Sequence, residues 1–117
     1  MVKQKDYTID SDLYSKIEIY LKNKDIKFIE KAYNFAREAH DGQLRLSGED
    51  FFEHPKQTAI FLADLKLDSS TIAAALLHDV VEDCDCDTQD IERIFGLDVS
   101  RLVDGVTKLS RNDVIGD

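Results

Sequence analysis

The sequence predicts an all-α protein of about six helices, on the basis of three observations. Apolar residues recur at intervals of three and four along most of the chain, and no stretch alternates apolar and polar residues as a strand does. Helix-capping residues and glycines separate these stretches. The chain has 117 residues, 43% of them hydrophobic, which is enough for one domain with a buried core.

The first two helices are predicted from their caps and apolar faces. Asp10 or Ser11 can cap a helix whose apolar residues follow the i, i+4, i+7 rule, namely Leu13, Ile17, Tyr20 and Leu21. Asp25 opens a second helix that Gly42 is placed to end, with Phe28, Ala32, Phe35 and Ala39 on its apolar face. The following stretch, GQLRLSGEDFFE, has two glycines and no helical period, so we predict a loop.

The next two helices flank a short connection. A third is expected to start at His54 and Pro55, because proline in the first turn loses no hydrogen bond. Asp68, Ser69 or Ser70 caps a fourth, in which six consecutive apolar residues, 72 to 77, predict burial on every side.

Two shorter segments complete the prediction. Thr88 and Asp90 mark the start of a fifth helix that Gly96 closes. A sixth helix carries Val99, Leu102, Val103 and Val106, contains Gly105, and is expected to end near Leu109, since SRNDVIGD is polar and shows no period. No linker divides the chain, so we expect one unit over residues 1–117.

Composition excludes several classes of protein. A net charge of −9 argues against a general nucleic-acid binder, which needs clustered Lys and Arg. No apolar run approaches the ~20 residues that span a bilayer, and MVKQKDYTID lacks a signal-peptide core, so we expect no membrane partner and a cytoplasmic location. Cys84 and Cys86 are too close in sequence for an unstrained disulfide and are expected to be reduced thiols in a loop.

The fourth helix carries an unusual polar group in the stretch AALLHDVVED. Four-residue spacing places His78 above Glu82 and Asp79 above Asp83. Buried without partners, such groups cost several kcal/mol each, and a divalent cation bound by imidazole and carboxylate would offset that cost. His54 is the third candidate ligand, because the positive end of a helix dipole favours a neutral imidazole. His40 is expected on the polar side of its helix, as a capping or core histidine held by hydrogen bonds.

Three blocks of the sequence carry a family resemblance. AHDGQLRLSGEDFFEHP, LLHDVVED and FGLDVSRLVDGVTKL, within residues 29 to 109, together resemble the N-terminal hydrolase domain of the RelA/SpoT homologue family. The resemblance implies an HD-domain-like helical bundle and a (p)ppGpp 3′-pyrophosphohydrolase of the stringent response, as the first part of a bifunctional synthetase/hydrolase of the GTP pyrophosphokinase family. Its cofactor would be Mn²⁺ and its partner a guanine nucleotide.

The resemblance also implies roles for individual residues. His54, His78 and Asp79 would bind the metal; Glu82 and Asp83 would activate and position the attacking water; Arg45 and Ser47, in the RxSG loop, would contact the nucleotide. This chain has Leu46 where many members of the family have a basic residue.

The fourth metal ligand of the family lies in a later segment resembling ADRLHN, before which this sequence stops. We therefore expect an incomplete hydrolase domain with weakened metal binding, and a homodimer through exposed core surface.

Two alternatives remain at this point. The chain could be an inactive helical module that binds metal or nucleotide weakly, or an HD phosphohydrolase of another nucleotide, because other enzymes share the chemistry of the doublet.

Overall fold

The structure, a computed structural model, describes residues 8–44, 46–84 and 86–115, with the side chains of Asp83 and of 107–115 left out. Within these ranges it has six helices: α1 (Ser11–Glu18), α2 (Asn23–Ala39), α3 (Glu53–Asp64), α4 (Ser69–Asp83), α5 (Thr88–Phe95) and α6 (Leu97–Ile115). The described residues form no strand, only an isolated bridge between Leu44 and Asp50. The predicted all-α class is therefore confirmed.

Local capping explains several helix boundaries. The Asp10 carboxylate accepts hydrogen bonds from the amides of Asp12 and Leu13, both at 3.1 Å, and starts α1 as predicted. Asp87 and Asp90 form a reciprocal capping box at the start of α5. Gly96 ends α5 with φ of 100°, a conformation that favours glycine.

Three predicted boundaries were wrong. Helix α2 begins at Asn23 rather than Asp25, and α3 begins at Glu53 rather than His54. Pro55 still lies in the first turn of α3, where backbone amides have no intrahelical partner. Helix α6 continues to Ile115 instead of ending near Leu109. Its last residues include neither proline nor glycine, and extending an existing helix costs far less than nucleating one.

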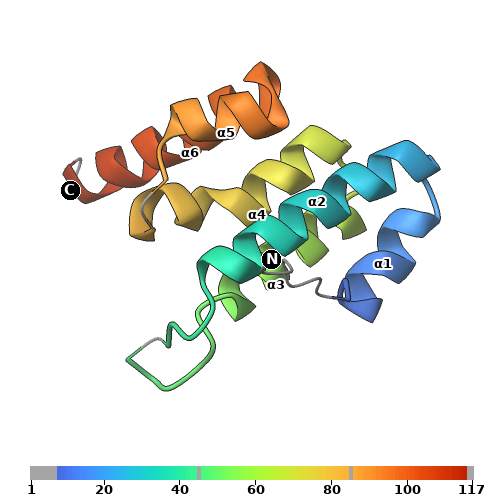
Figure 1. Cartoon of the computed structure of the whole chain (residues 1–117), viewed down its shortest axis with the longest axis horizontal. Helices are drawn as coiled ribbons and strands as arrows, with labels where there is room; N and C mark the ends of the chain where they lie inside the picture. The colour runs from blue at the N-terminus through green and yellow to red at the C-terminus, as the bar shows by residue number, and fades with distance from the viewer. Residues whose placement is uncertain (1–7, 45, 85, 116–117) are drawn as a thin grey trace, which may run out of the picture.

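Helix α4 occupies the centre of the fold. It packs against α2, α3 and α6, while α5 packs on α6 and α1 packs on α3 and α2 (Figure 1). All six residues from Ile72 to Leu77 are buried, as their unbroken apolar run predicted. The polar end of α4 is thereby held at a fixed place by three neighbouring helices.

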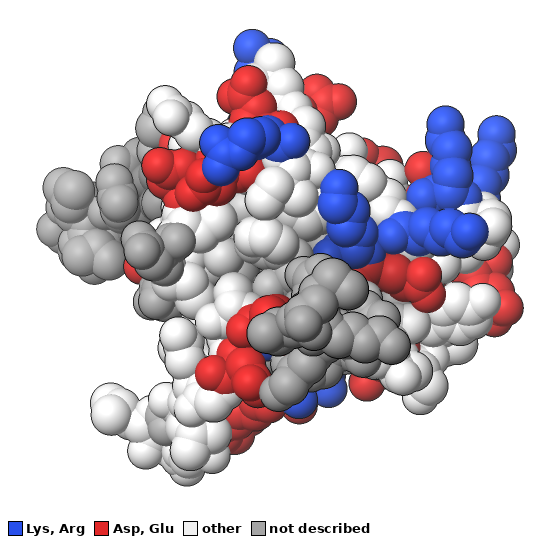
Figure 2. All heavy atoms as spheres, viewed as in Figure 1, with Lys and Arg blue, Asp and Glu red and all other residues white. Residues whose placement is uncertain are grey.

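Aromatic side chains pack between α2 and α5. Phe95 meets the rings of Phe28 and Phe35 edge-on, at centroid distances of 6.0 and 5.4 Å. In the described part of the chain, no helix is both long and apolar enough to cross a membrane. Carboxylates and cationic side chains are interspersed on the face drawn in Figure 2.

Candidate metal and nucleotide site

A histidine and two carboxylates meet near the C-terminal end of α4. His78 Nε2 lies 3.3 Å from an Asp79 carboxylate oxygen and 3.5 Å from a Glu82 carboxylate oxygen. One ligand atom from each of the three residues lies within 4.8 Å of the others, the one such group among the residues whose side chains are described. Asp79 is buried, with 8% exposure, whereas Glu82 reaches solvent. The predicted stacking of His78 over Glu82 is confirmed.

This donor set suits a divalent cation. Imidazole nitrogen and carboxylate oxygen are ligands that Mn²⁺ and Zn²⁺ accept in proteins. The three side chains come from one rigid helix and converge without any backbone rearrangement, and the two carboxylates would offset the charge of the ion. Among the described side chains, His78, Asp79 and Glu82 therefore fit a divalent metal ion. Glu82 is near enough to be a third ligand, in addition to its predicted role in activating the attacking water.

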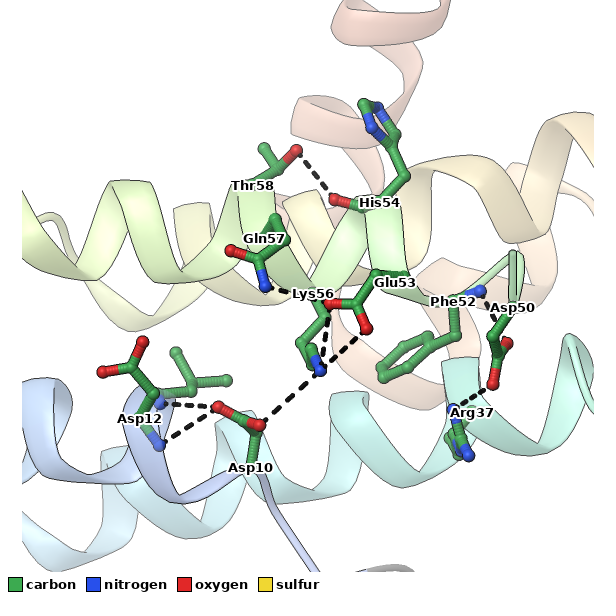
Figure 3. A network of polar contacts seen from close by, with 11 residues as sticks. Asp10, Asp12, Arg37, Asp50, Phe52, Glu53, His54, Lys56, Gln57 and Thr58 are labelled. Carbon is green, nitrogen blue, oxygen red and sulfur yellow. Dashed lines mark hydrogen bonds and ion pairs between the residues drawn. The ribbon is translucent and has the colours of Figure 1, made fainter. Parts of the chain in front are cut away.

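His54 is not part of this group. It lies in the first turn of α3, is exposed, and its ring points away from the Lys56 and Glu53 side chains of the same helix (Figure 3). Its assignment as a metal ligand remains a prediction. Asp83 ends α4 as expected, but its side chain lies outside the described residues.

The predicted nucleotide loop joins α2 to α3. Arg45 lies outside the described residues. Ser47 is exposed and lines a cavity of about 540 Å³ together with Leu46, Glu49 and Phe51. The Phe51 amide donates to the Gln43 carbonyl at 3.0 Å and closes the loop at its neck. A surface-open cavity of this size can admit part of a nucleotide.

His40 lies elsewhere than predicted. It caps the C-terminus of α2, but it is 1% exposed, so its expected place on the polar side was wrong. Its ring stacks on Phe51 at 5.0 Å, and its Nδ1 lies 3.2 Å from the side-chain oxygen of Gln43. The sequence did contain the signal: His40 follows Ala32 and Ala36 at four-residue spacing, which places it on the buried face.

The two cysteines are free thiols, as predicted. Burial, followed by the negative charges of Asp90 and Asp87, raises the pKa of Cys86, so this thiol is protonated at neutral pH. Cys84 directly follows α4 and packs against the core.

An ion-pair network fixes the N-terminal turn of α3 to α1. Lys56 Nζ lies 3.1 Å from Glu53 and 3.6 Å from Asp10, on the side of α3 away from the His54 ring (Figure 3). The hydrogen bond donated by Gln57 lowers the pKa of Glu53 most, and the hydrogen bond donated by Lys56 lowers it further. Burial alone would lower the pKa of Lys56, but the hydrogen bond and charge of Glu53, with Asp10 and Tyr33, raise it.

The chain is similar in sequence to several curated proteins. SpoT of Escherichia coli strain K12, a bifunctional (p)ppGpp synthase/hydrolase, is 50% identical over 95 residues, which are 81% of this chain and 14% of that protein. A guanosine-3′,5′-bis(diphosphate) 3′-pyrophosphohydrolase of Vibrio cholerae is 46% identical over 105 residues, 90% of this chain and 15% of the relative. A GTP pyrophosphokinase of Brucella ovis is 38% identical over 104 residues, which are 89% of this chain and 14% of the relative.

These relatives confirm the resemblance to RelA/SpoT homologues that the three sequence blocks predicted. The chain spans about one seventh (14%) of the length of the curated relatives it matches. The sequence model of the HD domain family matches residues 32–115, a range that includes the loop, α3, α4 and α5. The chain therefore belongs to the HD domain family.

Proposed function

We propose that this chain is the hydrolase part of a bifunctional (p)ppGpp synthase/hydrolase, and that it releases pyrophosphate from the 3′ position of (p)ppGpp with Mn²⁺ as cofactor. The observation that carries the proposal is the convergence of His78, Asp79 and Glu82 on α4 of a chain 46% identical to a 3′-pyrophosphohydrolase.

The side chains of α4 suit this chemistry. His78 Nε2 and an Asp79 carboxylate oxygen would hold the divalent ion. When bound, the ion supplies a Lewis acid and a water of lowered pKa. Glu82 reaches solvent beside them, and a carboxylate oxygen there can accept the proton of the attacking water. The water oxygen bonds to phosphorus, the bond from that phosphorus to the 3′ oxygen breaks, and the 3′ oxygen takes up a proton as pyrophosphate is released.

The loop between α2 and α3 would hold the nucleotide. Ser47 lines its cavity beside Phe51, whose ring offers an apolar face to a base. Because the chain carries a net charge of −9, an anionic substrate needs cations supplied locally, and we assign that role to the metal and Arg45.

The direct test is pyrophosphate release from ppGpp, measured with and without Mn²⁺. It should be run on this chain and on a longer chain that includes the segment resembling ADRLHN. We expect Mn²⁺-dependent release in the longer protein and its loss in His78→Ala. Absence of release from both folded proteins would overturn the proposal.

A further inference from the structure

Four side chains from three segments meet at the base of the loop. We name His40, Gln43, Phe51 and Cys84 the His40 clasp. Nδ1 of His40 lies 3.2 Å from the Gln43 side-chain oxygen and 3.6 Å from the Cys84 sulfur. The Gln43 amide nitrogen lies 3.8 Å from the same sulfur, and the thiol donates to the Ala39 carbonyl at 3.4 Å.

The clasp joins the loop to the end of the metal-site helix. Gln43 and Phe51 are the two ends of the loop neck, bonded to each other through their backbones at 3.0 Å. Cys84 is the C-cap of α4, two residues after Glu82. His40 touches both sides, because it stacks on Phe51 and contacts Cys84. The base of the predicted nucleotide loop is thereby packed against the end of α4.

The hydrogen bonds of His40 indicate one tautomer. A neutral imidazole donates from only one nitrogen. Nδ1 faces the Gln43 oxygen, an acceptor, whereas Nε2 is buried and has no hydrogen-bond partner among the described residues. The proton therefore belongs on Nδ1, where it forms a hydrogen bond, and the lone pair of Nε2 is buried without a described partner. An aliphatic residue would cost less to bury here, so stability alone does not account for a histidine.

We infer that His40 is a positioning residue: together with Cys84 it holds the two ends of the loop, Gln43 and Phe51, at the distance from α4 that a nucleotide bridging loop and metal requires. The nucleotide part of this inference rests on the proposed function. The mechanical part, that the clasp immobilises the loop, stands on the contacts alone.

Amide hydrogen exchange tests the mechanical part on the full chain. In His40→Leu, which keeps an apolar side chain in the core, the Phe51 amide should exchange about tenfold faster, since a buried hydrogen bond and a ring stack are lost. Cys84→Ala, a smaller change, should accelerate it in the same direction. Ile91→Val is the matched control, because Ile91 is also fully buried but lies on α5. Loop exchange in both clasp variants no faster than in this control would overturn the inference.

Nucleotide binding provides the second readout. We expect His40→Leu to weaken ppGpp binding about tenfold while Mn²⁺ affinity changes less than twofold, and His40→Asn, which retains a donor near the Nδ1 position, to recover part of the loss. Equal loss of ppGpp and Mn²⁺ affinity would show a merely structural role and overturn the positioning role. If neither the unaltered chain nor the longer protein bound ppGpp, the proposed function would fail, and hydrogen exchange would still decide whether the clasp holds the loop.

Discussion

At the scale of single residues, the buried carboxylate of Asp79 is the feature that most needs a physical explanation. It is buried on a helix in which residues 72–77 are all apolar, and one of its carboxylate oxygens lies 3.3 Å from His78 Nε2. Burying an ionised carboxylate with an imperfect partner costs several kcal/mol. A cation shared with His78 would offset much of this cost.

The first prediction concerns metal affinity. His78→Ala removes the one nitrogen ligand of the described group, and we expect Mn²⁺ affinity to fall by at least about 10–100-fold, the range seen even for residues that only support ligands. Isothermal titration with MnCl₂ measures it. Glu92→Ala, an exposed carboxylate on α5, should leave the affinity unchanged, and an unchanged affinity in His78→Ala would remove α4 from the metal site.

The second prediction concerns pH. The lowered pKa of Glu53 means that its stabilisation is present above its ordinary value of 4.5 and is lost as pH falls through the folded-state pKa. The raised pKa of Lys56 means that its stabilisation is present below its ordinary value of 10.5 and is lost as pH rises through the folded-state pKa. Lys56→Met should therefore reduce the free energy of unfolding by about 0.5–1 kcal/mol at neutral pH and by less outside this window.

Urea unfolding of the wild type and Lys56→Met from pH 3 to pH 11 checks this prediction. Lys16→Met serves as control, because within the described residues the ion pair of Lys16 is with the exposed Asp64 alone, at 3.3 Å. A difference between wild type and Lys56→Met that stays constant over the whole range would contradict the ion-pair account.

At the scale of elements, two glycines of similar exposure should respond oppositely to alanine. Gly105 lies inside α6, and a Cβ there would meet nothing within 4 Å, so Gly105→Ala should stabilise the protein by about 1 kcal/mol through helix propensity. Gly96 has equal space, but its φ of +100° strains any other residue, so Gly96→Ala should destabilise by about 1–3 kcal/mol. Denaturant unfolding midpoints of the two variants, compared with the wild type, measure the sign of each change in stability. Stabilisation by Gly96→Ala would contradict the described end of α5.

At the scale of the whole molecule, α4 joins the other helices into one cooperative unit. Leu76 is fully buried in the helix that packs against α2, α3 and α6, so Leu76→Ala should cost about 2–5 kcal/mol. Leu65, 56% exposed after the end of α3, is the control, and Leu65→Ala should cost within about 0.5 kcal/mol of zero. Thermal unfolding followed by circular dichroism should show one transition in each case. Two separated transitions in Leu76→Ala would contradict a single core.

The sequence by itself determined the features that depend on neighbours along the chain. Asp10 and the Asp87–Asp90 pair start helices through bonds that reach at most three residues, and the apolar run at 72–77 predicts a central helix. The stacking of His78 over Glu82 also follows from four-residue helical spacing within one helix. The family resemblance could be recognised for the same reason, because each of the three motif blocks is a continuous stretch of sequence.

Only the tertiary structure decided how separate segments meet. Cys84 contacts Gln43 although the two lie 41 positions apart in the sequence, and this contact, with the burial of His40, arises where the ends of α2 and α4 pack together. The orientation of His54 likewise depends on how α3 rotates against its neighbours, which a cap or a period does not specify. Local hydrogen bonds fix where helices begin, whereas burial of side chains from distant segments fixes which polar groups face one another.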